Sequence, residues 1–227
     1  MKVSAALFGS ALLVVFLGAC SRGGGPHEAV VAGGPSIPAS LKAQTIDPAA
    51  ILFSLPTLCD ALPPLAPPVE RAPSGSFQLH EDDWRQIEFV GNGDRQAVER
   101  ELAELRTFKK TNQAGVGWKN VFVRSGRPEA IRASRVGLRR LLDMSGGDSR
   151  LLFIETGEGS SEVRGGFAIP LGDGAFLYGF AFDGKVVSLS LQLDRESSGG
   201  RNVRISKIER AFGLFVVDWY RAEILPS

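Results

Sequence analysis

The chain has 227 residues, with 26 basic and 25 acidic side chains and a formal net charge of +1. A nearly neutral chain lacks the basic footprint of a general nucleic-acid binder, and two cysteines are too few for a disulfide-rich scaffold or a four-cysteine zinc site. Hydrophobic residues make up 44% of the chain, which excludes an acidic disordered tail and predicts a globular domain.

The first 19 residues have the features of a secretory signal peptide. Met1-Lys2 is a positive start, Ala5 to Leu17 is an apolar stretch, and the small residues Gly18 and Ala19 follow. The apolar stretch is shorter than the ~20 residues of a transmembrane span. We therefore expect residues 1–19 to be removed, which leaves residues 20–227 with 25 basic and 25 acidic side chains.

The run Leu17-Gly18-Ala19-Cys20 resembles the lipobox of bacterial lipoproteins. Gly18 departs from the commonest residue at its place but is small. The resemblance implies that Cys20 becomes the first mature residue and carries a thioether-linked diacylglycerol and an N-acyl chain, such as palmitate. Ser21 in place of Asp resembles the pattern of lipoproteins sorted to the outer membrane, facing the periplasm. The resemblance ends near residue 21; an ordinary signal peptide followed by an incidental cysteine is the alternative.

Ten of the 13 prolines lie between Pro26 and Pro73, which divides the mature chain into a proline-rich segment and a domain. Residues 20–46 are rich in Gly, Pro, Ser and Ala, which predicts a flexible tether with a reach of about 28 Å. Residues 47–76 carry too many apolar side chains for a free linker. We expect them to form an arm packed on the domain, with a helix starting at Asp47-Pro48 and a short turn from Ser54 to Leu62. A docking peptide for a partner protein is the alternative.

Two helices and two strands are expected in the first half of the domain, residues 77–227. Trp84 to Val90 and Trp118 to Arg124 are rich in aromatic and β-branched residues, as strands are. Asp94 is a candidate cap for a helix from Arg95 to Lys110, and a second helix is expected from Gly126 to Asp143.

Four strands with glycine-rich turns are expected next, at Arg150–Glu155, Glu162–Ile169, Ala175–Phe182 and Lys185–Leu193. Asp183-Gly184 is a strong hairpin signal, and Phe176, Tyr178, Phe180 and Phe182 share one face.

The C-terminal segment has two possible readings. A short helix from Lys207 to Phe212 ends at Gly213 and precedes a strand from Leu214 to Ala222, or one long helix covers the whole segment. The first reading is favoured by Gly213 and the β-branched pair after it. The element order predicts an α+β domain with a mainly antiparallel sheet of about six to seven strands and two or three helices.

The densest charge bias is a run of arginines with Glu129 as its only acid, and it begins at Arg124. Guanidinium groups bind carboxylates and phosphates, so the run predicts a docking surface for an acidic partner or anionic lipid headgroups. A solvated helix face with intramolecular carboxylate pairs is the alternative. The candidate binding residues are Arg127, Arg132, Arg135, Arg139 and Arg140.

Catalytic and metal-binding patterns are weak in this sequence. The segment from His80 to Asp83 places four potential ligands in a row, which fits a polar turn or cap better than a metal site. Glu155, Glu158 and Glu162 border one expected turn and are the nearest candidates for a carboxylate pair. Cys59 lies among leucines, and we expect its thiol to be buried.

These observations predict a lipid-anchored envelope protein whose domain is a non-catalytic protein-binding module with an accessory or immunity-like role. Its expected partners are the bilayer, through Cys20, and an envelope protein, without nucleic acid, metal or a further cofactor. A periplasmic hydrolase acting on cell-wall or glycan material through paired carboxylates is the alternative. A weaker alternative is a small-ligand carrier with a pocket beneath the Phe176–Phe182 face.

Overall fold

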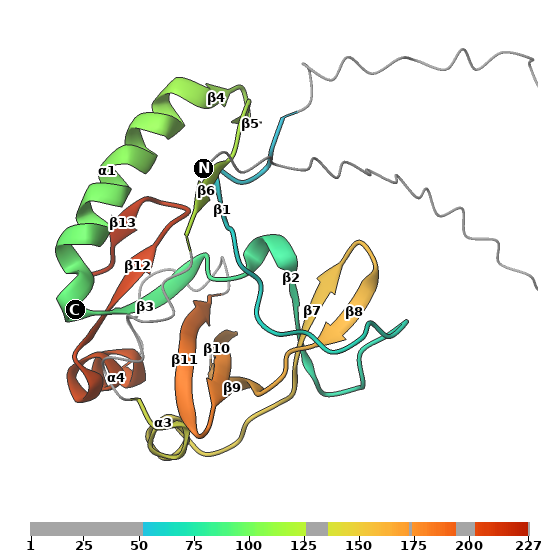
Figure 1. Cartoon of the computed structure of the whole chain (residues 1–227). Helices are drawn as coiled ribbons and strands as arrows, with labels where there is room; N and C mark the ends of the chain where they lie inside the picture. The colour runs from blue at the N-terminus through green and yellow to red at the C-terminus, as the bar shows by residue number, and fades with distance from the viewer. Residues whose placement is uncertain (1–51, 126–135, 173, 194–202, 227) are drawn as a thin grey trace, which may run out of the picture. The chain divides into compact units, whose positions relative to one another are not determined.

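A computed structural model describes residues 52–125, 136–172, 174–193 and 203–226 (Figure 1). The largest sheet has six strands in the order β13-β12-β3-β11-β10-β9, and all of its pairings are antiparallel. In chain order the strands are β3 (Ile87–Gly91), β9 (Gly166–Gly172), β10 (Ala175–Phe182), β11 (Lys185–Gln192), β12 (Leu214–Asp218) and β13 (Glu223–Ile224).

The remaining strands form three small sheets. One has the order β2-β7-β8 and consists of β2 (Phe77–His80), β7 (Leu152–Thr156) and β8 (Gly159–Glu162). The others are a parallel pair of β1 (Thr57–Cys59) with β6 (Phe122–Arg124) and a hairpin of β4 (Gln113–Ala114) with β5 (Gly117–Trp118). The pairing of β2 with β7 is also parallel, so each of the two parallel pairs joins strands that lie far apart in the sequence.

Three α-helices and two short 3₁₀ helices lie in the described part of the chain: α1 (Arg95–Asn112), α3 (Leu138–Ser145), α4 (Val203–Phe212), η2 (Glu81–Asp83) and η3 (Asn92–Asp94). The α+β class and the antiparallel sheet predicted from the sequence are confirmed. None of the helices among the described residues is both long and apolar enough to cross a membrane.

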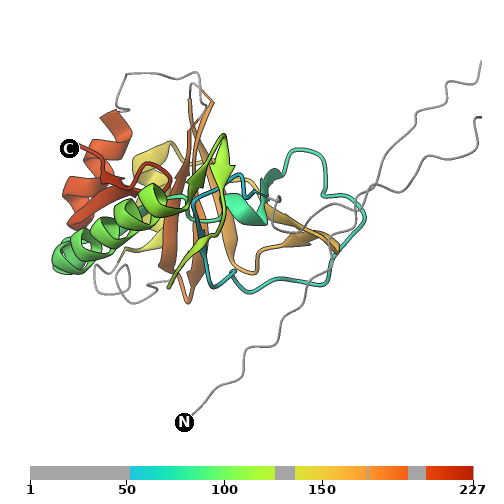
Figure 2. The same cartoon turned by 90° about the horizontal axis from the view of Figure 1, so that it is seen from above.

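Different elements pack on the two faces of the six-stranded sheet (Figures 1 and 2). Helices α3 and α4 pack on one face through Leu141, Ile208 and Phe212. On the other face α1 packs against β3 and β12, while the β2-β7-β8 sheet packs against Tyr178 of β10. The second face is therefore covered by two separate apolar clusters, and the strip of sheet between them carries polar side chains.

Local signals fixed several elements as the sequence predicted. Helix α1 begins at Arg95 and buries Val98, Leu102 and Leu105, which follow helical spacing. Asp183 and Gly184 both have positive φ, 50° and 70°, and connect β10 to β11 as a tight hairpin. The helix–strand reading of the C-terminal segment is confirmed, because α4 ends before Gly213, whose φ is +64°.

The second expected helix is only partly right. Residues 126–135 lie outside the described residues, while Val136 and Gly137 are extended rather than helical. Gly137 forms a β-bridge with Lys185, and α3 begins one residue later. Glycine weakens a helix interior by about 1 kcal/mol, so the bridge overrides the apolar spacing that favoured a continuous helix.

The strand boundaries also differ from expectation where turns interrupt apolar runs. Trp84 lies in a turn before β3, and the run from Trp118 to Arg124 is divided between β5 and β6. Likewise, Glu162–Ile169 is divided between β8 and β9 by a turn that contains Gly165, with φ +70°. Positive φ at Arg85 and Gly165 accompanies two of these three interruptions.

The arm is extended where it is described, so the helix and turn expected there are wrong for residues 52–62. Phe53 forms a bridge with Trp118, Thr57–Cys59 forms β1, and Leu65 and Val69 form bridges along β8 and the turn after it. The backbone partners offered by these strands outweigh the local proline and cap signals. The packing of the arm on the domain agrees with the expectation for its described residues.

Candidate functional site

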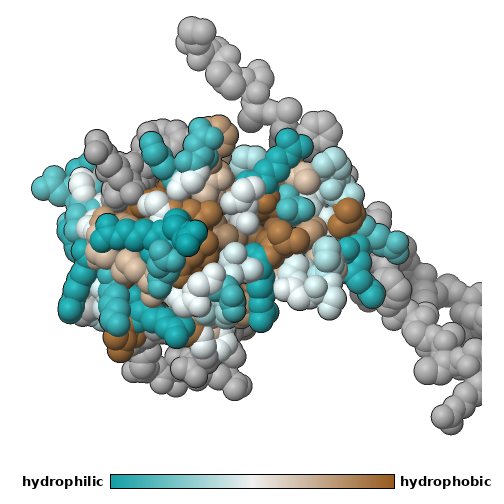
Figure 3. All heavy atoms as spheres, turned by 90° about the horizontal axis from the view of Figure 1, so that it is seen from below, coloured by the Kyte–Doolittle hydropathy of each residue, from teal (hydrophilic) through white to brown (hydrophobic). Residues whose placement is uncertain are grey.

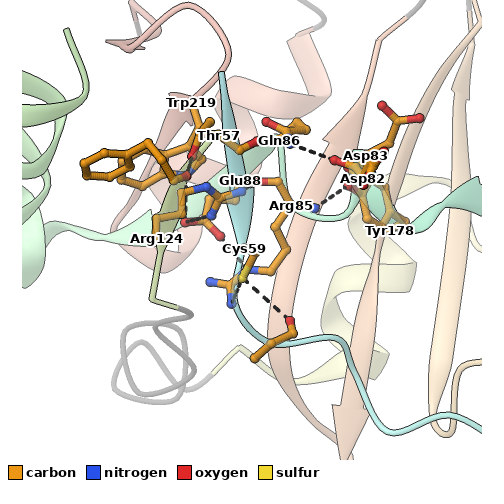
Figure 4. Close-up of polar contacts among 12 residues, drawn as sticks. Thr57, Cys59, Asp82, Asp83, Arg85, Gln86, Glu88, Arg124, Tyr178 and Trp219 are labelled. Carbon is orange, nitrogen blue, oxygen red and sulfur yellow. Dashed lines mark hydrogen bonds and ion pairs between the residues drawn. The ribbon is translucent and has the colours of Figure 1, made fainter. Parts of the chain in front are cut away.

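A buried polar cluster fills the strip between the two apolar clusters (Figure 4). Its centre is Glu88 on β3, and its side chain lies beside Arg85 from the preceding turn and Arg124 from β6. Glu88 is 2% exposed and Arg124 is 1% exposed. Charged side chains so deeply buried need partners, because an unpaired ion loses its hydration without compensation. The other members are Thr57, Cys59, Gln86, Tyr178 and Trp219.

The Glu88 carboxylate has three partners from three parts of the chain. Arg85 Nε donates to Oε2 at 2.6 Å, and the Trp219 indole N–H donates to Oε1 at 2.9 Å. Arg124 Nη1 lies 3.7 Å from Oε1 as an ion pair. Charge-assisted hydrogen bonds of this kind are stronger than neutral ones, so Glu88 joins β3, β6 and the end of β12.

Arg124 reaches the cluster because β6 runs parallel to the arm. Its guanidinium lies 5.0 Å from the Trp219 ring centroid, and its Nη2 donates to the backbone carbonyl of Arg85. Burial lowers the pKa of Arg124, and the Glu88 charge opposes that shift. Two guanidinium groups thus share one carboxylate, and the aromatic face of Trp219 contributes a further attraction for the cation.

Arg85 is held in a strained backbone conformation, with φ +59°. Its N–H donates to the Tyr178 hydroxyl at 3.0 Å, and that hydroxyl donates to the carbonyl of Asp83 at 3.1 Å. Burial lowers the pKa of Arg85, but the combined interactions with Glu88, Cys59 and Tyr178 outweigh it, so the pKa is raised overall. Burial also raises the pKa of Tyr178, which keeps its hydroxyl as a neutral donor and acceptor. Left-handed φ at a non-glycine residue costs about 1–2 kcal/mol, so these contacts must hold the turn in place.

The cluster acts as a structural tie between the arm, the turn and the sheet. Gln86 Nε2 donates to the carbonyls of Thr57 and Asp82, at 2.9 and 2.7 Å, which fixes β1 to the turn. We did not predict the cluster from the sequence. One signal was present: Glu88 and Val90 lie two residues apart on β3, so they share a face, and Val90 belongs to the α1 core. A charge on a core face indicates a buried partner of opposite sign.

The structure describes only part of the predicted arginine surface. Arg127, Arg132 and Arg135 lie outside the described residues. Arg139 and Arg140 occupy consecutive positions on α3: the Arg139 side chain is 91% exposed, and the Arg140 guanidinium lies 5.1 Å from the Phe212 ring centroid. Arg139 has a carboxylate partner, Asp143, at 3.5 Å, but exposed pairs of this kind contribute little.

Arg124, at the start of the same run, is a core residue, so the charge run is not one surface. Helix α4 extends the basic surface instead. Lys207 and Arg210 are exposed and lie three residues apart, and α4 adjoins α3 through the Arg140–Phe212 contact. Neither cation was predicted to be a binding residue, although their helical spacing was a usable signal.

The catalytic candidates are not drawn together in a cleft. Glu155, Glu158 and Glu162 are all exposed on or beside the β7–β8 hairpin. Two surface hollows lie along α1, with volumes of about 490 and 580 Å³, and none of these glutamates lines either of them. His80 caps η2 by accepting a hydrogen bond from the N–H of Asp82 at 3.2 Å, as expected of a polar cap. Within the described ranges no group of three or more His, Cys, Asp or Glu could hold a metal ion.

The two cysteines have different outcomes. Cys20 lies outside the described residues. Cys59 is half-buried rather than fully buried, and its thiol contacts the Ala61 carbonyl and lies 3.9 Å from Arg85 Nη1. The expected leucine environment is replaced in part by the arginine, because β1 is a strand whose side chains alternate between two faces.

The aromatic face of β10 is covered by side chains from the smaller sheet. Phe77 stacks on Phe176 with ring centroids 4.5 Å apart, and Tyr178 packs against Trp84 at 5.6 Å. Phe182 was expected on the same core face but is exposed, at the last position of β10 before the hairpin turn. This packing fills the space that the small-ligand hypothesis requires.

Comparisons of the chain with protein-family models, with curated proteins and with solved structures find no significant match.

Proposed function

We propose that the protein is a lipid-anchored envelope lipoprotein whose α+β domain binds an acidic protein partner without catalysis. The anchor is supported by the run Leu17-Gly18-Ala19-Cys20 and the signal-peptide pattern before it. Two or more acyl chains on Cys20 would give stable membrane attachment, since each buried methylene contributes about 0.8 kcal/mol.

The observation that carries the binding proposal is the basic surface of the adjoining helices α3 and α4. Its described members, Arg139, Arg140, Lys207 and Arg210, are all exposed, and Asp143 is the acidic residue that pairs with Arg139. Figure 3 looks onto the end of the domain that carries these helices and shows hydrophilic side chains surrounding apolar ones. Such a surface favours electrostatic steering of a negatively charged partner.

The position of this basic surface favours a protein over lipid headgroups. Helices α3 and α4 lie at one end of the domain, and the described chain begins at Leu52 beside the β4–β5 hairpin at the opposite end (Figure 1). A tether from Cys20 reaches the domain at that opposite end. The basic surface would then face away from the anchoring bilayer and toward envelope proteins.

Charge reversal tests the basic surface. Arg139→Glu combined with Lys207→Glu should abolish capture of the partner by the lipidated protein from detergent-solubilised envelope. The matched control is Arg100→Glu, an exposed arginine on α1. Capture of the same proteins by the double variant and wild type would contradict the proposal, as would recovery of no specific partner by wild type. Because steering by exposed charge is screened by salt, capture should also weaken between low and physiological ionic strength.

The anchor has its own test. Cys20→Ala should release the mature protein from the membrane fraction into the soluble fraction. Unchanged membrane retention that survives high salt and carbonate washing would contradict lipid attachment at Cys20.

A further inference from the structure

An exposed apolar patch surrounds the point at which the described chain begins. It consists of Leu52 and Phe53 from the arm, Val116 at the β4–β5 turn and Tyr220 after β12, which we call the entry patch. Val116 is 99% exposed, and the other three are each at least 40% exposed. Soluble surfaces seldom gather large apolar side chains in this way, so the patch needs an occupant.

The entry patch is one connected structure. Phe53 and Trp118 exchange both backbone hydrogen bonds, at 2.8 and 3.0 Å, so the arm continues the β4–β5 hairpin as a third strand. The Trp118 ring meets the Tyr220 ring edge-on, with centroids 6.1 Å apart. Gly117 allows this close approach, because a Cβ there would lie 2.6 Å from the Phe53 carbonyl oxygen. The exposed side chains are therefore held on a fixed framework.

Lysines stand beside the apolar side chains. Lys109 Nζ donates to the Tyr220 carbonyl at 2.6 Å and lies 5.6 Å from the centroid of its ring. Lys110, in the last turn of α1, and Lys119, after β5, are both exposed. The Lys119 N–H donates to the carbonyl of Asn112, the last residue of α1. Exposed aliphatic residues with aromatic rings and lysines at their edge are the composition of surfaces that lie at a membrane interface.

The tether restricts what the entry patch can meet. The sequence-predicted spacer reaches about 28 Å as a coil, whereas a domain of this size is about 40 Å across. The chain that comes from the proposed anchor enters the described domain at Leu52, within the entry patch. A weak contact made by the entry patch becomes intramolecular once Cys20 is inserted, so even a low intrinsic affinity would be effective.

We propose that the entry patch docks on the surface of an anionic phospholipid bilayer. Val116 and Phe53 enter the boundary between headgroups and acyl chains, Tyr220 lies at headgroup depth, and the lysines meet lipid phosphates. In the cell this contact rests on the proposed Cys20 anchor, but the patch has an affinity of its own. Docking holds the domain in one orientation, with α3 and α4 directed away from the membrane.

The test uses the full mature chain, residues 20–227, carrying Cys20→Ala so that no acyl chain contributes. Binding of this parent chain is measured by co-sedimentation with vesicles of phosphatidylethanolamine and phosphatidylglycerol, with neutral phosphatidylcholine vesicles as the reference. We expect measurable binding to the anionic vesicles that weakens with salt. Val116→Asp should reduce that binding about tenfold or more, because it replaces an inserting side chain with a charge that anionic lipid repels.

Val203→Asp is the matched control, because Val203 is 68% exposed at the start of α4, at the other end of the domain. It should bind the anionic vesicles as the parent chain does. Lys110→Glu together with Lys119→Glu should remove the preference for anionic over neutral vesicles. Both valines project into solvent, so neither substitution threatens folding, and far-UV circular dichroism verifies this.

Two results would overturn the proposal. The first is no binding of the parent chain to anionic vesicles; the second is equal binding by the Val116→Asp and Val203→Asp chains. If Val116→Asp lost partner capture but bound vesicles as before, the patch would be a protein-binding surface, and this result would also overturn the proposal. Failure of the anchor appears separately, in the cell fractionation of Cys20→Ala, because the vesicle assay contains no lipidated protein.

Discussion

Replacing Glu88 with Gln should destabilise the domain severely, although the side chain keeps its shape. The substitution removes the only carboxylate in hydrogen-bonding or ion-pair contact with both Arg85 and Arg124 among the described residues. The amide retains one acceptor, which can serve either Arg85 Nε or the Trp219 indole N–H but places an NH₂ group against the other donor. Two buried cations lose the carboxylate that they share.

The expected magnitude follows from burial. Removing one partner of a buried ion pair costs about 3–5 kcal/mol, because the remaining charge stays desolvated. One kcal/mol shifts the melting temperature of a domain of this size by about 2–4 °C, so Glu88→Gln should lower it by roughly 6–20 °C. The exposed pair Arg95–Glu99, with N–O distance 3.8 Å, provides the comparison: Glu99→Gln should cost less than about 0.5 kcal/mol.

Urea unfolding of the three proteins, followed by tryptophan fluorescence and circular dichroism, measures these differences. A second substitution isolates the cause: Arg124→Met in the Glu88→Gln background removes one orphaned cation and should recover part of the loss. The coupling between the two sites should exceed about 1 kcal/mol in a double-mutant cycle. A loss below about 1 kcal/mol for Glu88→Gln, or additive effects of the two substitutions, would refute the view that buried charge pairing ties the turn, β6 and β12 together.

Two further substitutions test other parts of the fold. Gly213→Ala should destabilise the domain by about 1–2 kcal/mol in urea unfolding, because φ there is +64° although a Cβ would have room. The control is Gly93→Ala, at ordinary φ and in open space, which should be neutral or stabilising. Equal effects of the two substitutions would contradict this reasoning. Burial raises the pKa of Asp218 above its ordinary value of 3.8, against the Arg221 N–H and charge, so the folded state holds that proton more tightly than the unfolded chain does. Ionisation therefore costs stability as pH rises through that window, and Asp218→Asn should be more favourable, relative to wild type, at pH 7 than at pH 3.5; a pH-independent difference between the two would show that the cause is wrong.

Local chemistry made the regular parts of the fold predictable. Gly213 marked the end of α4, Asp183-Gly184 marked the hairpin between β10 and β11, and the spacing of Val98, Leu102 and Leu105 marked α1. Each of these signals involves residues within a few positions of one another. Much of the antiparallel sheet followed because β9, β10 and β11, and likewise β12 and β13, pair with their neighbours in the chain, whereas the place of β3 between β11 and β12 depends on distant pairings.

The site was harder to foresee because its contacts are distant in sequence. Arg124 lies 39 residues from the carbonyl that it meets, and Trp219 lies 131 residues from Glu88. The Arg124 contact depends on the parallel pairing of β1 with β6, and so on the arm, for which the sequence favoured a helix and a turn. The Trp219 contact depends on the pairing of β12 with β3. Composition treated Arg124 as one of a run of surface arginines, and only its position on β6, where it pairs with β1 and reaches Glu88, distinguishes it from Arg139.

The two proposed surfaces support one another through their separation. If the entry patch faces the bilayer, the basic residues of α3 and α4 lie at the far end of a domain about 40 Å across. The negative potential of a membrane falls off within about 8 Å at physiological salt, so lipid phosphates would not compete for Arg139 and Lys207. Loss of the entry patch would free the domain to turn on its tether and expose that basic surface to the bilayer. Val116→Asp in the lipidated protein should therefore weaken partner capture on membranes while leaving capture in detergent unchanged. Equal capture by this variant in both settings would show that the basic surface does not depend on the entry patch.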